Sequence, residues 1–255
     1  MGRKIENDEP LGTPMSLGDH LEELRARIIL ALAGLAVGVI AGFFLAKDAF
    51  LLLESQYKKA MPDRPLTTLA PTDAFVGYTK IAIIVGLIFS SPWVFYQLWK
   101  FVSTGLYPRE KRYVYIAVPF STGLFITGAL FFLFFIAPVT LSFFVEFGKW
   151  LGVDSTWTFP EYLSFITSLM LIFGLAFQTP IVVFVLIKTG LVPVGTFAHY
   201  RRFVILAVAI IAAAVTPTPD AFTMIMLAVP LYLLFELGIL IGYISERKKA
   251  KEENR

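Results

Sequence analysis

The chain has 255 residues, of which 57% are hydrophobic and 16% are charged, and its formal net charge is +3. Soluble domains carry about 25% charged residues, so this composition excludes a water-soluble fold and predicts an all-α integral membrane protein. The absence of cysteine excludes disulfides and thiolate metal sites. Only two histidines are present, which argues against a histidine-rich metal centre. We therefore expect no cofactor and no metal.

Six apolar segments follow one another along the chain, at about 26–46, 74–98, 114–145, 161–187, 203–216 and 221–244. A transmembrane helix needs roughly 20 apolar residues. The fifth segment has only 14 residues, which at about 1.5 Å per residue span about 21 Å of a hydrocarbon core about 30 Å thick. We therefore expect six transmembrane helices, with short fifth and sixth spans.

Prolines interrupt these apolar segments, at positions 92, 119, 138, 180 and 230. They permit kinks, because neighbouring groups in the bundle can satisfy the backbone that each proline frees. Together with the short fifth span, they predict a kinked, concave bundle. We expect a single domain over 1–255, with flexible cytoplasmic tails at 1–15 and 246–255.

The distribution of basic residues predicts the orientation of this bundle. If the N-terminus is cytoplasmic, 16 Lys and Arg residues fall in cytoplasmic segments and five fall in outer segments, while Lys80 lies inside a span. Cytoplasmic loops of membrane proteins carry the excess of Lys and Arg. The count therefore predicts that both termini lie in the cytoplasm.

The stretch SLGDHLEELRARI, at 16–28, places five charged residues at the start of the first apolar segment. Ser16 and Asp19 fit a capping box, and Glu23 and Arg27 are spaced to pair across one helical turn. Four apolar residues fall on one helical face, namely Leu17, Leu21, Leu24 and Ile28. One interpretation is an interfacial helix whose charges satisfy each other. The other is a binding site for a cationic ligand.

Glu110 allows a similar pair of interpretations, one structural and one in which it binds a ligand. It is the only acid among seven basic residues in the two cytoplasmic loops. It can simply stabilise the first turn of a helix that Pro108 opens, or it can bind a cation.

Two segments resemble signatures of the TatC family, the polytopic receptor subunit of the twin-arginine protein translocase. HLEELRAR at 20–27 is similar to the family's N-terminal HLxELRxR, and SPWVFYQLWKFVSTGLYPREKR at 91–112 is similar to its first cytoplasmic loop. FGLAFQTPI at 173–181 resembles its fourth span, and TPTPDAFTMIMLAVPLYLLFE at 216–236 resembles its last hairpin. The sequence departs from the family at Gln178, where Glu is frequent, and at Thr104, where Pro is usual.

This resemblance implies a glove-like fold and a receptor for the signal peptides of folded cargo, which carry two adjacent arginines. A guanidinium group presents a planar fork of donors that matches a carboxylate. By resemblance, Glu23 and Glu110 would bind the two arginines at the cytoplasmic face, whereas Glu22 is a solvated charge. The expected signal-peptide site consists of Glu23, Glu110, Arg25, Phe101 and Leu106. Trp99 is either a further contact for the apolar part of the signal or a member of an interfacial aromatic belt.

Several polar residues lie in or near the apolar segments, where a charge is costly. The set is Lys80, Gln178, Thr216, Asp220 and Glu236. Three interpretations are open: a proton or ion path, an interhelical pair between Lys80 and Glu236, and contact with the single-span partners TatA and TatB that the resemblance implies. Lys80 can also extend outward from near the outer end of its span.

The resemblance implies a bacterial cytoplasmic (inner) membrane protein that self-associates in a larger receptor complex, supports export driven by the proton-motive force, and binds no nucleic acid. The alternative is a proton-coupled secondary transporter of a small solute, which Lys80, Glu236 and Asp220 would favour and the absence of an internal repeat disfavours. No Ser–His or paired-Asp arrangement lies within the apolar segments, and no GxxxxGK[ST] loop occurs. We therefore expect that the protein is not an enzyme.

Overall fold

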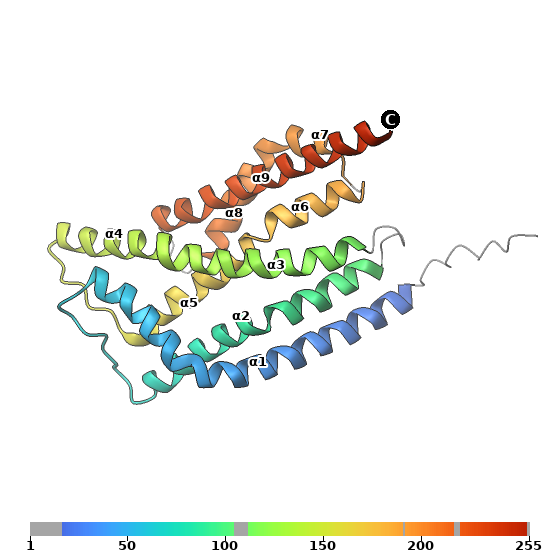
Figure 1. Ribbon diagram of the computed structural model, residues 1–255. Helices are drawn as coiled ribbons and strands as arrows, with labels where there is room; N and C mark the ends of the chain where they lie inside the picture. Colours follow the sequence, from blue (N-terminus) through green and yellow to red (C-terminus); the bar gives the residue numbers. More distant parts are fainter. Residues whose placement is uncertain (1–16, 105–111, 191, 217–219, 254–255) are drawn as a thin grey trace, which may run out of the picture.

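The protein is a bundle of long helices (Figure 1). The computed structural model describes residues 17–104, 112–190, 192–216 and 220–253. The elements of these residues, in chain order, are α1 (Leu17–Ala60), α2 (Asp73–Thr104), α3 (Arg112–Phe131), the π-helical turn η1 (Phe132–Ile136), α4 (Ala137–Trp150), α5 (Phe159–Ala176), α6 (Thr179–Lys188), α7 (Val194–His199), α8 (Arg201–Val215) and α9 (Ala221–Glu253).

Among the residues that the structure describes, five apolar helical segments are long enough to cross a membrane. They lie in α1, in α2, in the continuous run α3–η1–α4, in α5–α6 and in α9. Helix α8 has 15 residues and reaches only about 22 Å at about 1.5 Å per residue. The start of α1 and the end of α9 lie at the same end of the bundle (Figure 1). This placement is consistent with six membrane crossings, in which α8 is the short fifth transmembrane helix.

Two helices run further than the sequence predicted. The apolar segment expected at 26–46 belongs to a helix that continues to Ala60, because its second half is amphipathic. That half buries Leu53 and Tyr57, while Glu54 and Lys58 form an ion pair of 3.0 Å. The apolar part of α9 ends near Ile244 as predicted, but the helix continues to Glu253. The sixth helix therefore extends beyond its predicted span.

Glycines allow α1 and α2 to pack at very short range along their length (Figure 1). A Cβ atom on Gly38 would lie 2.5 Å from the carbonyl oxygen of Gly86. A Cβ atom on Gly42 would lie 2.2 Å from the carbonyl oxygen of Ala82. Small residues at such contacts let two membrane helices gain van der Waals energy along their backbones. This contact fixes the position of the charged start of α1 against the end of α2.

The prolines have different effects in different helices. Pro92, Pro119 and Pro230 lie inside α2, α3 and α9 without ending them. Pro180 instead lies in the first turn of α6, a position where a missing N–H costs nothing. The fourth span is consequently interrupted just before it, between the end of α5 at Ala176 and the start of α6 at Thr179.

At the end of the bundle opposite the start of α1, the second half of α1 and the loop that follows it are tied to α5 and to the loop that precedes α5. The Tyr162 hydroxyl donates to the Leu53 carbonyl over 2.7 Å. Arg64 pairs with Asp154 at 3.1 Å and donates to the Ser155 carbonyl at 3.0 Å. These contacts explain why α1 turns towards α4 in its second half (Figure 1).

Candidate functional site

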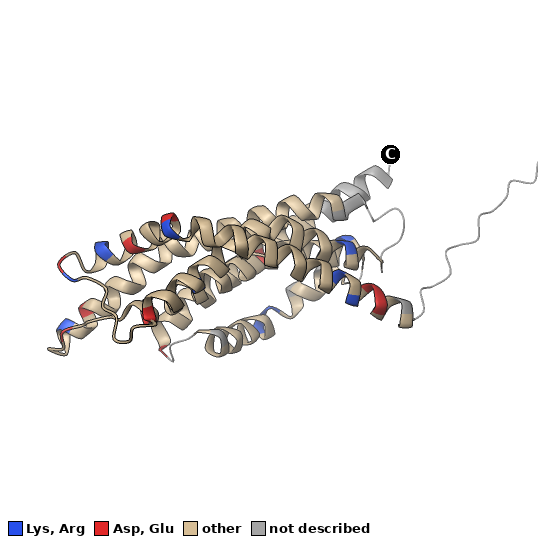
Figure 2. Ribbon diagram, turned by 90° about the horizontal axis from the view of Figure 1, so that it is seen from below, with Lys and Arg blue, Asp and Glu red and all other residues tan. Residues whose placement is uncertain are grey.

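Charged residues gather towards the two ends of the bundle, and the length between them carries few of them (Figure 2). A site that recognises a charged ligand is therefore expected at one of these ends. We use the name terminal end for the end where α1 begins, α2 ends and α9 ends (Figure 1). Glu23, one of the two acids predicted to bind a cation, lies near the start of α1 and therefore at this terminal end.

Glu23 and Arg27 form the predicted pair on α1. The Nε and Nη2 atoms of Arg27 lie 2.7 Å and 2.6 Å from the Oε1 atom of Glu23. The side chain of Glu23 is 27% exposed and that of Arg27 is 18% exposed. The carboxylate is thus already engaged by a guanidinium, yet it remains accessible from outside.

The same arginine connects this pair to α2. Its Nη1 atom donates to Oε1 of Gln97 over 3.2 Å, and Gln97 is only 2% exposed. Arg27 therefore bridges a partly exposed carboxylate on one helix and a buried amide on the next. The spacing along α1 predicted the pair of Arg27 with Glu23 but not the contact with Gln97, although a polar residue within an apolar span was a usable signal.

His20 anchors the first turns of α1 to the last turn of α2. Its ring lies 4.7 Å from the Phe101 ring, centroid to centroid, at an interplanar angle of 33°. Its Nδ1 atom is 3.4 Å from the Thr104 hydroxyl, and that hydroxyl also donates to the Phe101 carbonyl at 2.7 Å. Phe101 stays partly exposed. The Thr104 departure from the family pattern thus supplies a polar contact that proline could not.

The structure brings only part of the predicted signal-peptide set together. Glu23, Arg25 and Phe101 lie at the terminal end, and Arg25 is exposed and makes no ion pair within the described residues. Glu110 and Leu106 lie outside the described residues, as does Ser16 of the expected capping box. Their roles remain predictions.

Trp99 and Gln178 meet at Ser121, which lies on α3 and is fully buried. The Trp99 Nε1 atom donates to the Ser121 hydroxyl over 2.8 Å. The Gln178 Nε2 atom donates to the Ser121 carbonyl over 2.9 Å. Trp99 is 6% exposed, so it faces the inside of the bundle and neither proposed exposed role fits it. No motif or periodicity pointed to Ser121.

Replacing Trp99 with Phe is expected to lower the free energy of unfolding by about 1–2 kcal/mol, because the ring is kept but the buried Ser121 hydroxyl loses its donor. The comparison is Trp150→Phe, since Trp150 is 77% exposed. Thermal unfolding of the two variants in detergent measures the difference. Equal midpoints for both variants would show that the Trp99 hydrogen bond contributes nothing.

The suggested pair between Lys80 and Glu236 does not form. Lys80 donates to the Ser164 hydroxyl over 2.5 Å. Glu236 pairs with Arg201 at 2.8 Å and accepts from the Tyr232 hydroxyl at 2.8 Å. Each of the two charged side chains instead contacts a residue on a neighbouring helix, which is Ser164 on α5 for Lys80 and Arg201 on α8 for Glu236.

The remaining predicted polar residues lie where α8 meets α9 and bond locally. The Thr216 hydroxyl donates to the Ala212 carbonyl over 2.8 Å. Asp220 accepts from the backbone N–H of Thr223 at 2.7 Å and from its hydroxyl at 2.5 Å, which caps the start of α9. Because Lys80, Gln178 and Glu236 are bonded to different residues, they do not form the clustered site that the transporter alternative needs.

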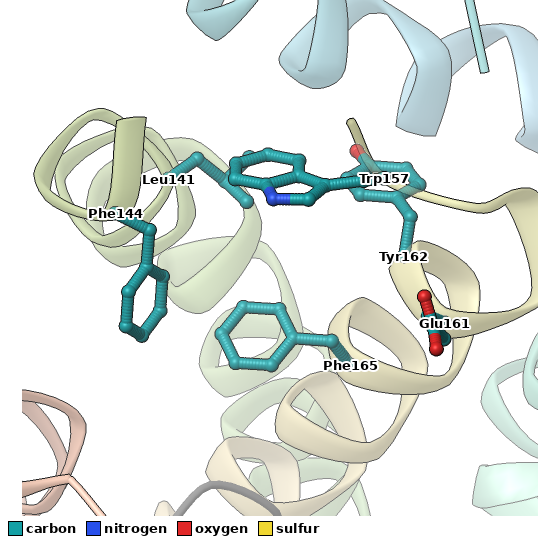
Figure 3. A pocket seen from close by; sticks show the side chains of 6 residues that line it. All are labelled: Leu141, Phe144, Trp157, Glu161, Tyr162 and Phe165. Atoms are coloured by element: carbon teal, nitrogen blue, oxygen red, sulfur yellow. The ribbon is translucent and has the colours of Figure 1, made fainter. Parts of the chain in front are cut away.

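A cavity of about 400 Å³ lies near the opposite end, between α4 and α5 (Figure 3). Its lining is mostly aromatic, and the residues are Leu141, Phe144, Trp157, Glu161, Tyr162 and Phe165. The Glu161 carboxylate accepts from the Thr158 hydroxyl over 2.7 Å, as in a helix cap. Among the described residues, no group of three acid or histidine side chains could hold a metal ion. The terminal end therefore carries the best candidate site.

These features define a multi-span helical membrane protein whose charged residues lie mainly towards the two ends of its bundle. A sequence model described as "TatC: Sec-independent protein translocase protein (TatC)" matches residues 19–230. The chain belongs to this family, which confirms the expectation from the motifs at 20–27 and 91–112. Members of this family are components of a protein translocase and are not enzymes.

Individual relatives agree over nearly the whole chain. The chain is 36% identical to the Sec-independent protein translocase protein TatC of Aquifex aeolicus (strain VF5), over 92% of this chain and 98% of the relative. It is 34% identical to the Sec-independent protein translocase protein TatCy of Bacillus subtilis (strain 168), over 93% of this chain and 92% of the relative. A solved structure described as "Crystal Structure of Twin Arginine Translocase Receptor- TatC" matches with a TM-score of 0.79 and 35% identity, over 89% of this chain and 99% of that chain.

Proposed function

We propose that this protein is the receptor subunit of a twin-arginine translocase and binds the signal peptides of folded cargo at its terminal end. The single observation that carries the proposal is the partly exposed carboxylate of Glu23, held by α1 against the end of α2 within a segment that matches the family's signature. With 16 basic residues on that side against five on the other, the terminal end faces the cytoplasm of a bacterial cell.

In the proposed complex, Glu23 and Glu110 each receive one of the two signal arginines. A carboxylate is the partner that the guanidinium fork fits best. Phe101 and Leu106 contact the apolar part of the signal that follows the arginines. Arg25 repels cations that engage only one acid, so that discrimination rests partly on repulsion.

We further propose that single-span subunits of the TatA and TatB type contact the polar residues of the membrane interior. Gln178 is the best supported of these residues. Its Nε2 atom is used by Ser121, but no described donor reaches its Oε1 atom, which can accept a hydrogen bond from a partner helix. The other polar residues already have hydrogen-bond partners within the chain, namely Thr216, Asp220, Glu236 and Lys80. They contribute to this contact only if they exchange those partners for groups on a single-span subunit.

Export of a folded reporter in cells that lack their own TatC tests the proposed function. This chain is expressed together with single-span subunits, and the reporter carries either an Arg-Arg signal or its Lys-Lys variant. Export of the Arg-Arg reporter alone, lost when the proton-motive force is dissipated, supports the proposal. Equal export of both reporters, or export of neither while the chain is present in the membrane, would contradict it.

A further inference from the structure

Arg27 occupies the carboxylate that the proposed function assigns to a signal arginine. We propose that Arg27 is an internal competitor: its guanidinium holds Glu23 in the unliganded receptor, and an incoming arginine must displace it. This inference rests on the proposed function and concerns the regulation of the same site.

The geometry of the pair supports competition. The Nε atom of Arg27 donates to one oxygen of Glu23, Oε1, over 2.7 Å, and its Nη2 atom forms an ion pair with the same oxygen at 2.6 Å. Within the described residues, no donor reaches the other oxygen, Oε2. A bidentate arginine of a ligand needs both carboxylate oxygens. Two guanidinium groups cannot share Oε1 in this way, so full engagement of the ligand requires that Arg27 leaves.

Arg27 has a second hydrogen-bond partner, so that breaking its contact with Glu23 costs little free energy. Its Nη1 atom donates to the buried Gln97, and this contact can persist after the Glu23 contact breaks. The Glu23–Arg27 pair is itself partly exposed, and such pairs across one helical turn contribute little stability. Competition of this strength lowers the affinity of every cation for Glu23. A ligand that also engages Glu110 regains this affinity through its second contact.

The decisive variant is Arg27→Gln, tested in nanodiscs with an Arg-Arg signal peptide and its Lys-Lys variant. Removal of the competitor should tighten binding of the Arg-Arg peptide about two- to five-fold, the worth of a partly exposed ion pair. Because competition acts on the unliganded receptor, binding of the Lys-Lys peptide should tighten by the same factor. The ratio of the two affinities should stay unchanged.

Two further variants separate pairing from charge. Arg27→Lys keeps the positive charge but loses the planar fork, and it should also tighten binding, by less than Arg27→Gln. Arg202→Gln removes one positive charge from α8, where Arg202 is exposed beside Phe203, and should leave the affinity within about two-fold.

Weaker binding to Arg27→Gln would overturn the inference, because Arg27 would then position Glu23 for the ligand. Unchanged binding would also overturn it, since the ligand would then use Oε2 with Arg27 still in place. Wild-type protein that binds both peptides equally would instead contradict the proposed function, so the two failures are distinguishable.

Discussion

Replacing Glu23 with Gln should weaken binding of an Arg-Arg signal peptide about ten- to a hundred-fold. The substitution keeps the size and one acceptor of the side chain but removes the charge. A hydrogen bond to a charged group contributes about 1.5–3 kcal/mol, which corresponds to this range of dissociation constants. Titration of a fluorescent peptide against the protein in nanodiscs measures the effect directly.

Glu22→Gln is the matched control for this prediction. Glu22 is adjacent in sequence, exposed, and makes no ion pair within the described residues, so the variant changes the same charge on the same turn. Its affinity for the peptide should stay within about two-fold of wild type. An equal loss in both variants would show that only the general negative potential matters, and no loss in either would place recognition elsewhere.

The second large effect concerns stability. Gly42→Ala should lower the free energy of unfolding by about 1–3 kcal/mol, because the added Cβ would lie 2.2 Å from the Ala82 carbonyl oxygen and 2.8 Å from the Gly86 backbone nitrogen. Backbone atoms cannot rotate away, so α1 and α2 must separate. The thermal unfolding midpoint in detergent reports the change.

The same substitution at Gly123 provides the comparison. A Cβ on Gly123 meets nothing within 4 Å, and alanine favours a helix over glycine by roughly 0.5–1 kcal/mol. Gly123→Ala should therefore unfold at an equal or higher temperature than wild type. If both variants unfold at the same temperature, the glycine contact between α1 and α2 is not what holds these helices together.

Features that depend on local sequence could be predicted. The apolar segments predicted the helices, because membrane helices satisfy their backbone internally and need only length and hydrophobicity. The spacing of Glu23 and Arg27 predicted their ion pair, since residues four apart share a helical face. The motifs at 20–27 and 91–112 identified the family.

Features that depend on packing between distant helices could not be predicted. The partner of Lys80 is Ser164, which lies 84 positions away, and no periodicity in the sequence relates the two. The same holds for Gln178, which donates to the backbone carbonyl of Ser121 on α3, 57 positions away. The extension of α1 to Ala60 was missed because the hydropathy pattern ends where the helix becomes amphipathic.

The most direct test of the central claim is a disulfide between the receptor and a signal peptide. The chain has no native cysteine, so Glu22→Cys and Trp150→Cys each introduce a unique thiol, one beside Glu23 and one near the opposite end of the bundle. The peptide carries one cysteine next to its arginine pair, activated as a mixed disulfide with thiopyridine, so that the receptor thiolate displaces the thiopyridine and forms the new disulfide. We expect rapid disulfide formation with Glu22→Cys, little with Trp150→Cys, and a slower reaction when the arginines are replaced by lysines. Equal rates at both positions, or a faster reaction at Trp150→Cys, would contradict a signal site formed by the start of α1 and the end of α2.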